Sequence, residues 1–237
     1  MIDWQPVILS LKVATISLLF VFILGIAMAL LMTRKQFPGK AVVESLITMP
    51  LVLPPVVTGF ALLLLIGRHG PAGKLMMAWF DVQLIFTQAA AILAAVVIAF
   101  PLMYQSAKAA LQSIDSSLED VARTLGAGEL RVMLTVTLPL AMPGLIAGAV
   151  LAFARALGEF GATIMIAGNI PGKTQTIPIA IYFATESNDL KEAGYYVAVI
   201  SVITFGAIFW LNTWSRKHSW HPGSIRGGRP YRVKSNN

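Results

Sequence analysis

Five long stretches without a charged side chain are the feature that most constrains this sequence. Each is at least 20 residues long, and a helix needs about 20 apolar residues to cross the hydrocarbon core of a bilayer. A soluble chain of 237 residues has no core that could bury five such runs. The sequence therefore predicts an all-α integral membrane protein with about five transmembrane helices. The stretches are Val13 to Met32, Ser45 to Gly67, Val82 to Ala107, Val132 to Ala154 and Ala193 to Ser215.

The lysines and arginines divide unevenly between the two sets of loops that five spans create. Cytoplasmic loops carry the excess of positive charge in membrane proteins. We therefore expect the N-terminus outside the cell and the C-terminus in the cytoplasm. The richer set contains Arg34, Lys35, Lys40, Lys108, Arg123, Arg131, Arg216, Lys217, Arg226, Arg229, Arg232 and Lys234. The poorer set contains Lys12, Arg68, Lys74, Lys173 and Lys191.

The formal net charge of +7 does not indicate a nucleic-acid partner, because its distribution follows membrane topology. We expect residues 7–215 to form the membrane domain. Residues 216–237 are expected to be a basic, flexible cytoplasmic tail that contacts anionic lipid. The first apolar run is too long for a cleaved signal, and the basic pair Arg34-Lys35 follows it rather than precedes it.

Several kinds of site chemistry find no support in the sequence. The chain has no cysteine, and its three histidines lack metal-ligand spacing. Residues 167–174 nearly match the phosphate-binding loop GxxxxGK[ST], but Ala167 replaces the first glycine and no strand is expected before it. The segment is also expected outside the cell, where ATP is absent. We therefore expect no nucleotide site, no metal site and no cofactor in this chain.

The cytoplasmic loop 113–139 contains the most informative pattern. Ser116 followed by Glu119 is a capping box, which predicts that a helix starts there. Four apolar residues then recur at helical spacing and form one face. The loop is too small to cover this face, so we expect the face to dock in a groove of a partner. The four residues are Leu118, Val121, Ala122 and Leu125.

The second half of this loop predicts a sharp corner and a return to the membrane. Gly126 stands where a helix commonly ends in a left-handed residue. A second helix is expected from about Glu129, and Pro139 is expected to mark the next turn. The loop is thus predicted to be a helical hairpin.

At these residues the chain resembles the binding-protein-dependent ABC importer permeases. Their motif is Glu-Ala-Ala, three residues, Gly, nine residues, Ile, one residue and Leu-Pro. Here the same spacing joins Asp120-Val121-Ala122, Gly126, Val136 and Leu138-Pro139, and Glu119 is an alternative source of the acid. The resemblance implies a type I ABC importer fold whose coupling helix inserts into a separate ATP-binding subunit. The residues it implicates are Glu119, Asp120, Ala122, Gly126, Leu138 and Pro139.

Residues 50–60, 155–163 and 168–178 resemble the molybdate and sulfate permeases, and the last two stretches are closer to the molybdate subunit. The resemblance extends to about residue 215. It implies import of molybdate across the cytoplasmic membrane, with sulfate or tungstate as alternatives. It also implies a homodimer, two cytoplasmic ATPase subunits and an external oxyanion-binding protein.

Candidate pathway residues lie in two of the spans. Pro50, Pro54, Pro55 and Gly59 are expected to interrupt the second span, either to expose backbone groups to a substrate or as a packing kink. Thr58 is the nearest polar side chain. Arg155 and Glu159 are the only charges well inside a span, and their spacing of four allows them to pair. They are either a gate pair near the external side or a structural pair.

Two further points stay open at this stage. The uncharged run 174–185 is too short to span, so it is an interfacial or re-entrant segment or a buried loop. An ion-coupled secondary transporter is a more remote alternative function. Such a protein would show repeated halves and several intramembrane acids, whereas here Glu159 stands alone and no repeat is visible. The leading interpretation is a transport subunit without catalytic chemistry.

Overall fold

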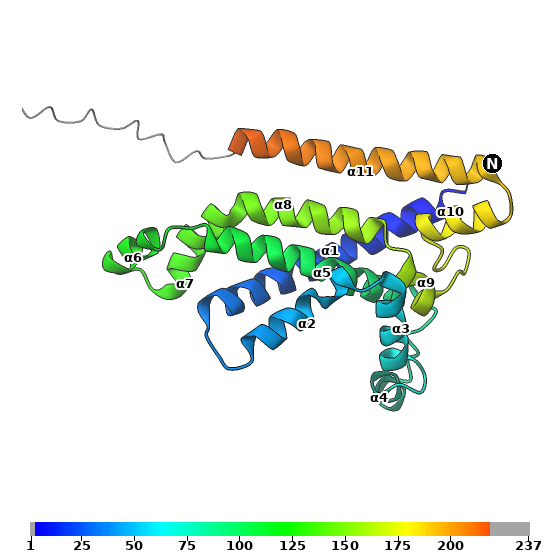
Figure 1. Ribbon diagram of the computed structural model, residues 1–237, viewed down its shortest axis with the longest axis horizontal. Coiled ribbons are helices and arrows are strands. Elements are labelled where there is room, and N and C mark those ends of the chain that lie inside the picture. Colours follow the sequence, from blue (N-terminus) through cyan, green and yellow to red (C-terminus); the bar gives the residue numbers. More distant parts are fainter. Residues whose placement is uncertain (1–2, 219–237) are drawn as a thin grey trace, which may run out of the picture.

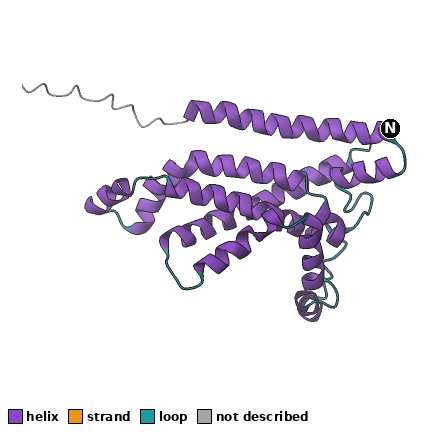
Figure 2. Cartoon of the chain, in the orientation of Figure 1, coloured by secondary structure: helices purple, strands orange, loops and turns teal. Residues whose placement is uncertain are grey.

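The computed structural model describes residues 3–218, and every regular element within them is a helix (Figure 2). Four helices of the described part of the chain are long and apolar enough to cross a membrane: α1 (Gln5–Arg34), α5 (Gln88–Gln112), the continuous run Glu129–Leu157 that ends in α8 (Leu138–Leu157), and α11 (Leu190–His218). They lie side by side along the long axis of the molecule (Figure 1). Four of the five expected spans are therefore confirmed as single long helices. The tail expected over 216–237 lies outside the described residues from 219 onward.

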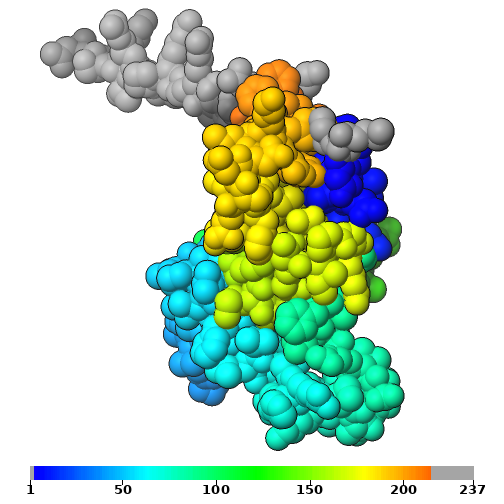
Figure 3. Space-filling model, turned by 90° about the vertical axis from the view of Figure 1, so that its right-hand side faces the viewer, coloured from blue at the N-terminus to red at the C-terminus, as the bar shows by residue number. Residues whose placement is uncertain are grey.

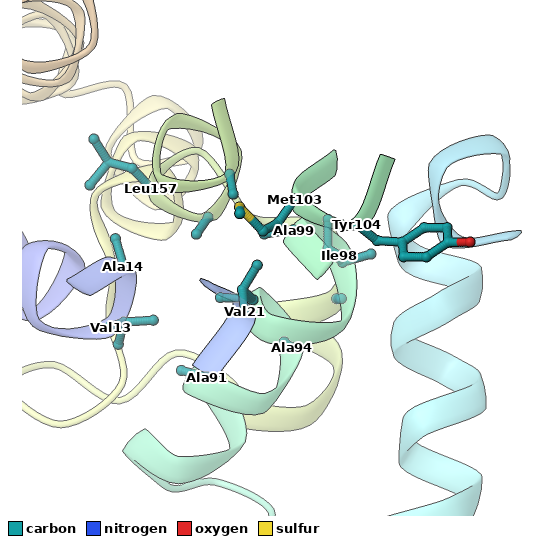
Figure 4. Close-up of a cluster of buried hydrophobic side chains, with 14 of the residues drawn as sticks. Val13, Ala14, Val21, Ala91, Ala94, Ile98, Ala99, Met103, Tyr104 and Leu157 are labelled. Carbon is teal, nitrogen blue, oxygen red and sulfur yellow. The ribbon is translucent and has the colours of Figure 1, made fainter. Parts of the chain in front are cut away.

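Small side chains bring α1, α5 and α8 into close contact. Ala91, Ala94 and Ala99 of α5 are fully or almost fully buried against α1 and α8 (Figure 4). A Cβ on Gly25 of α1 would lie 2.8 Å from Cγ of Met103. Lipid tails are as apolar as leucine, so close packing of small residues drives association of membrane helices. These three helices form the core of the chain.

Helix α11 is attached more loosely. It packs along α8 and the short helix α10 (Ile177–Glu186), yet large apolar side chains on it remain exposed, including Val202, Phe205 and Phe209. An apolar face of this extent is suited to lipid or to another membrane subunit.

The second expected span, Ser45 to Gly67, is not one straight helix. The chain bends by 120° between helices α2 (Lys40–Val52) and α3 (Pro55–Ile66). Leu53 and Pro54 at the break are extended, because a residue before proline avoids the helical region and proline removes a backbone donor. The expected interruption is confirmed: α2 and α3 together are long and apolar enough for a fifth span, which is broken at Leu53 and Pro54.

Helices α3 and α4 (Pro71–Phe80) leave the bundle near the end that carries the N-terminus (Figure 1). In the end-on view they form a lobe away from the N-terminal segment and α11 (Figure 3). The third expected span begins at Val82, whereas α5 begins at Gln88. Its start is fixed by Thr87, whose side chain accepts a hydrogen bond from the Ala90 amide.

The uncharged run 174–185 becomes helix α10 over most of its length. Ile177, Ile179 and Ala180 are buried where α10 packs against α11 and α1. The Ser10 hydroxyl of α1 accepts a hydrogen bond of 2.7 Å from the Ile177 amide. The segment is therefore a short helix that packs against the bundle and does not span the membrane.

Candidate functional site

The helical hairpin predicted over 113–139 lies at the end of the bundle opposite the N-terminus (Figure 1). Helix α6 (Ser116–Thr124) is followed by Gly126 with φ +86°, and α7 (Glu129–Val132) begins where the second helix was expected. The Ala127 amide donates to the Ala122 carbonyl across the corner. The left-handed glycine and the helix start at Glu129 are confirmed.

The start of α6 differs from the expected capping box. Asp115 is the N-cap, and its Oδ1 accepts a hydrogen bond of 2.9 Å from the Ser117 amide. This bond holds the pKa of the Asp115 carboxyl below its usual value. Aspartate is as good an N-cap as serine, so the cap moves one residue back and leaves Glu119 free for other contacts.

Glu119 is the centre of a charged cluster that joins the hairpin to the bundle. Its Oε1 accepts a hydrogen bond from the Thr137 hydroxyl and lies 3.3 Å from Nη2 of Arg34, the last residue of α1. Its Oε2 lies 3.0 Å from Arg123. The hydrogen bond from Thr137 is the largest cause that lowers the pKa of Glu119, and the two arginines add to it.

Arg123 closes the hairpin on itself. Its Nε lies 2.6 Å from Glu129 on α7, and its Nη1 lies 2.8 Å from Asp120. The Glu129 contact is the main cause of the raised pKa of Arg123. Asp120 and Glu119 are thus both tied to one guanidinium.

Sequence reasoning used Arg34 only as a topology charge and did not single out Thr137. Both touch Glu119, yet they lie 85 and 18 residues from it in the chain. No local spacing rule connects such distant residues, so only the folded structure reveals this cluster.

Three apolar side chains of α6 are exposed. The exposed fractions of Leu118, Val121 and Leu125 are 48, 58 and 83%. Together with the start of α8 and the end of α11 they line an open groove of about 770 Å³. Besides these three residues the groove is lined by Ala122, Thr135, Val136, Pro139, Leu140, Met142, Pro143 and Trp214.

Pro139 does not mark a turn, as the sequence had suggested. It lies in the first turn of α8, and the path from α7 to α8 stays helical through a π-helical segment, η1 (Met133–Thr137). Proline cannot donate a backbone hydrogen bond and crowds the preceding turn. The wider η1 turn directly before it relieves that crowding, so the helix continues.

The expected pairing of Arg155 with Glu159 is present, with 2.7 Å between Nη1 and Oε2. Oε1 of Glu159 accepts a hydrogen bond of 2.8 Å from the Ala162 amide in the first turn of α9 (Gly161–Ala167). The Glu159 side chain is 1% exposed and that of Arg155 is 30% exposed. Both oxygens of Glu159 are therefore used to hold the break between α8 and α9.

Thr58 lies on α3, which packs tightly against α9. A Cβ on the adjacent Gly59 would lie 2.7 Å from Cα of Ala162. Thr58 is buried, and its hydroxyl has no hydrogen-bond partner among the described residues. Thr58 therefore lies on α3, next to helix α9, whose first turn Glu159 holds. The structure shows no bond between Thr58 and the Arg155–Glu159 ion pair.

The segment 167–174 resembles a phosphate-binding loop only in sequence. It follows helix α9, with no strand before it, and Gly168 and Gly172 both have positive φ. The Thr174 side chain is buried and accepts a hydrogen bond from the Ile170 amide within the same loop. The hydroxyl is used to stabilise the loop.

Comparison with known proteins identifies the family. Residues 21–215 match the family described as binding-protein-dependent transport system inner membrane component. This chain belongs to that family. It is accordingly a multi-pass protein of the inner membrane, and the matched region contains the whole hairpin.

Individual relatives are similar over most of their length. The chain is 48% identical to the molybdenum transport system permease protein ModB of Escherichia coli K12, over 84% of this chain and 87% of that protein. It is 45% identical to the putative molybdenum transport system permease protein YvgM of Bacillus subtilis, over 88% and 92%. The probable sulfate transport system permease protein cysT of Prototheca wickerhamii is 34% identical, over 86% and 80%.

A solved structure shares the fold of this family member. A bacterial ABC transporter involved in the import of the acidic polysaccharide alginate superposes with a TM-score of 0.74, at 18% identity, over 91% of this chain and 79% of that one. The expected type I ABC importer transmembrane fold is confirmed.

Proposed function

We propose that this chain is the channel-forming permease subunit of an ATP-driven importer that carries molybdate across the cytoplasmic membrane. The observation that carries the proposal is the 48% identity to a molybdenum permease over nearly the full length of both chains. Identity falls to 34% with the sulfate permease, so sulfate is the weaker candidate. Tungstate is nearly isosteric with molybdate and is an alternative substrate.

The hairpin α6–α7 is proposed to be the coupling element. The exposed residues Leu118, Val121 and Leu125 form an apolar face next to a groove, as expected of a helix that inserts into a partner. The partner in this proposal is a separate cytoplasmic ATPase subunit, since the chain contains no phosphate-binding loop of its own. The chain would then have no catalytic chemistry and would respond to ATP hydrolysis elsewhere.

The residues of the family motif have distinct physical parts in this proposal. Gly126 allows the corner after α6, and Ala122 keeps the apolar face shallow beside Val121. Glu119 and Asp120 hold Arg123, which fixes α6 against α7. Leu138 and Pro139 begin the helix that continues into the membrane.

The complete transporter is proposed to contain two copies of this chain, two ATPase subunits and an external oxyanion-binding protein. Four long helices and one bent pair within residues 3–218 are few for a self-sufficient pore, and the apolar faces left exposed on α3 and α11 leave room for a second copy. Substrate choice would then lie mostly in the binding protein, and the membrane pathway needs only weak affinity for the anion.

Arg155, Glu159 and Thr58 are proposed to stand near the external end of the pathway. The part of Arg155 that stays exposed could meet an anion, while Glu159 neutralises it and keeps binding weak. The buried contacts of Glu159 favour a second, structural part for the pair, namely holding α9 in place.

Uptake of labelled molybdate by cells with and without this gene tests the proposal. The assay uses trace molybdate, with excess unlabelled tungstate or sulfate as competitor. Gene-dependent uptake that tungstate blocks and sulfate does not is the expected result. Uptake blocked by sulfate would reassign the chain to sulfate import, and gene-dependent uptake of neither anion would overturn both substrate assignments.

A further inference from the structure

A second polar cluster lies where helix α2 packs against α5. Nζ of Lys108 on α5 lies 2.7 Å from Oε1 of Glu44 on α2, and the Tyr104 hydroxyl donates to the same oxygen over 3.2 Å. These side chains face a hollow of about 400 Å³. Its lining is Ala41, Glu44, Ser45, Thr48, Tyr104, Gln105 and Lys108, so six of the seven residues are polar.

The two helices contribute to this hollow with the same spacing. Residues 44, 45 and 48 lie on one face of α2, and residues 104, 105 and 108 lie on one face of α5. Glu44 is four residues from the start of α2, and Lys108 is four residues from the end of α5. At 1.5 Å per residue the cluster lies about 6 Å inside each helix end, on the side of the coupling hairpin.

The hollow remains accessible, as a passage requires. No residue of α2 is buried, and the side chains of Lys108 and Glu44 are 26% and 27% exposed. Polar and ionisable groups at membrane depth normally face a bundle interior or a water-filled cavity. The polar face of α2 is not covered by other parts of this chain. Such a face is suited to a water-filled opening of a pathway.

The distribution of donors and acceptors favours an anion in this hollow. The ammonium of Lys108 has three protons and donates one of them to Glu44 in a hydrogen bond. Both contacts of Glu44 are with donors, so its charge is already compensated. The amide of Gln105 adds further donors at the same wall. An incoming oxyanion would thus find spare donors and no uncompensated negative charge.

We propose that Lys108, paired with Glu44, forms a low-affinity oxyanion site at the cytoplasmic mouth of the membrane domain. The anion binds the free protons of the lysine ammonium and shares the lysine charge with Glu44, which keeps the affinity for the anion low. A site of this kind binds strongly enough to admit the ion and weakly enough to release it. The inference deepens the proposed function and rests on it for the class of substrate.

The test uses the complete transporter, with ATPase subunits and binding protein, reconstituted in liposomes and supplied with labelled molybdate. Lys108→Gln should lower the transport rate about tenfold, because a charge-assisted contact is lost. Lys108→Arg should stay within about twofold of the wild type. Lys12→Gln is the matched control, because Lys12 bonds Gln88 between α1 and α5 at the opposite end of the bundle.

Glu44→Gln distinguishes an anion site from a structural ion pair. It leaves Lys108 uncompensated, so molybdate added on the ATPase side should inhibit transport at about tenfold lower concentration than in the wild type. A purely structural pair predicts equal losses for Glu44→Gln and Lys108→Gln, with the double variant no worse than either and no change in inhibition. That pattern would overturn the inference.

The inference and the proposed substrate fail separately. A wild-type transporter that carries sulfate instead of molybdate would refute the substrate assignment alone. The same variants would then be compared with sulfate as the probe. A loss specific to Lys108→Gln would still support the site, and equal rates for Lys108→Gln and Lys12→Gln would refute it.

Discussion

Two glycines at the hairpin corner offer a matched test of the coupling proposal. Gly126 has φ +86° and Gly128 has φ −70°, and a Cβ at either position would meet no atom beyond its two chain neighbours within 4 Å. Alanine at Gly126 therefore adds backbone strain without a steric clash. Alanine at Gly128 adds neither. The two variants differ in backbone strain and in little else.

The size of the effect follows from the backbone alone. A non-glycine residue in the left-handed region costs about 1–2 kcal/mol, which corresponds to a factor of about 5–30 in the population of the native corner. If transport depends on that population, Gly126→Ala should lower uptake by up to this factor, and Gly128→Ala should stay near the wild type. Gly126→Asn should fall between them, because asparagine tolerates this region.

The assay is ATP-driven molybdate uptake in liposomes containing the complete transporter, normalised to the amount of subunit in the membrane. Gly126→Val should abolish uptake while the protein remains in the membrane, because valine adds strain and bulk at the proposed docking site. Equal uptake by Gly126→Ala and Gly128→Ala would refute the strained corner as a requirement. If uptake fell as much in Gly126→Asn as in Gly126→Val, side-chain bulk and not the positive φ of Gly126 would be the cause of the loss.

Three further predictions concern stability, measured by thermal unfolding in detergent. Gly59→Ala should destabilise by about 1–3 kcal/mol, because its Cβ would meet the backbone of α9, whereas Gly206→Ala, with open space around it, should not. Arg155→Gln should lower the free energy of unfolding by about 3–5 kcal/mol, because it leaves the buried Glu159 carboxylate without its ion pair. Glu159→Gln should lower it by less, because Arg155 is partly exposed. A larger loss for Glu159→Gln than for Arg155→Gln would contradict this account. Because the pKa of Glu119 is lowered, its carboxylate stabilises the fold above about pH 4.5, and this stabilisation is lost as the pH falls through the lowered pKa. The difference in stability between the wild type and Glu119→Gln should therefore disappear on acidification.

The sequence was sufficient for the elements that depend on local rules. Uninterrupted apolar runs identified four long helices, and the position of Gly126 identified the left-handed corner. The spacing of four residues also identified the Arg155–Glu159 pair, although Glu159 lies just beyond the end of α8. Each of these features is decided by residues within a few turns of one another.

The remaining features depend on contacts between distant residues or on competing local choices. The cluster around Glu119 joins it to Arg34, and the hollow joins Glu44 to Lys108, 64 residues later. The N-cap of α6 is Asp115 instead of the predicted Ser116, because aspartate and serine are equally good caps and the two residues are adjacent. Pro139 was mistaken for a turn because sequence rules do not anticipate a π-helical segment that accommodates it.

The unbroken helical path from Glu129 to Leu157 has a mechanical consequence. Its 29 residues make a rod about 43 Å long, with the hairpin at one end and Arg155 near the other. A tilt of about 5° about the hairpin end would displace the far end by about 4 Å, more than the length of the ion pair there. If the hairpin docks an ATPase as proposed, small movements at that end are amplified at the far end of the rod, and the π-helical segment η1 lies on the path that transmits them.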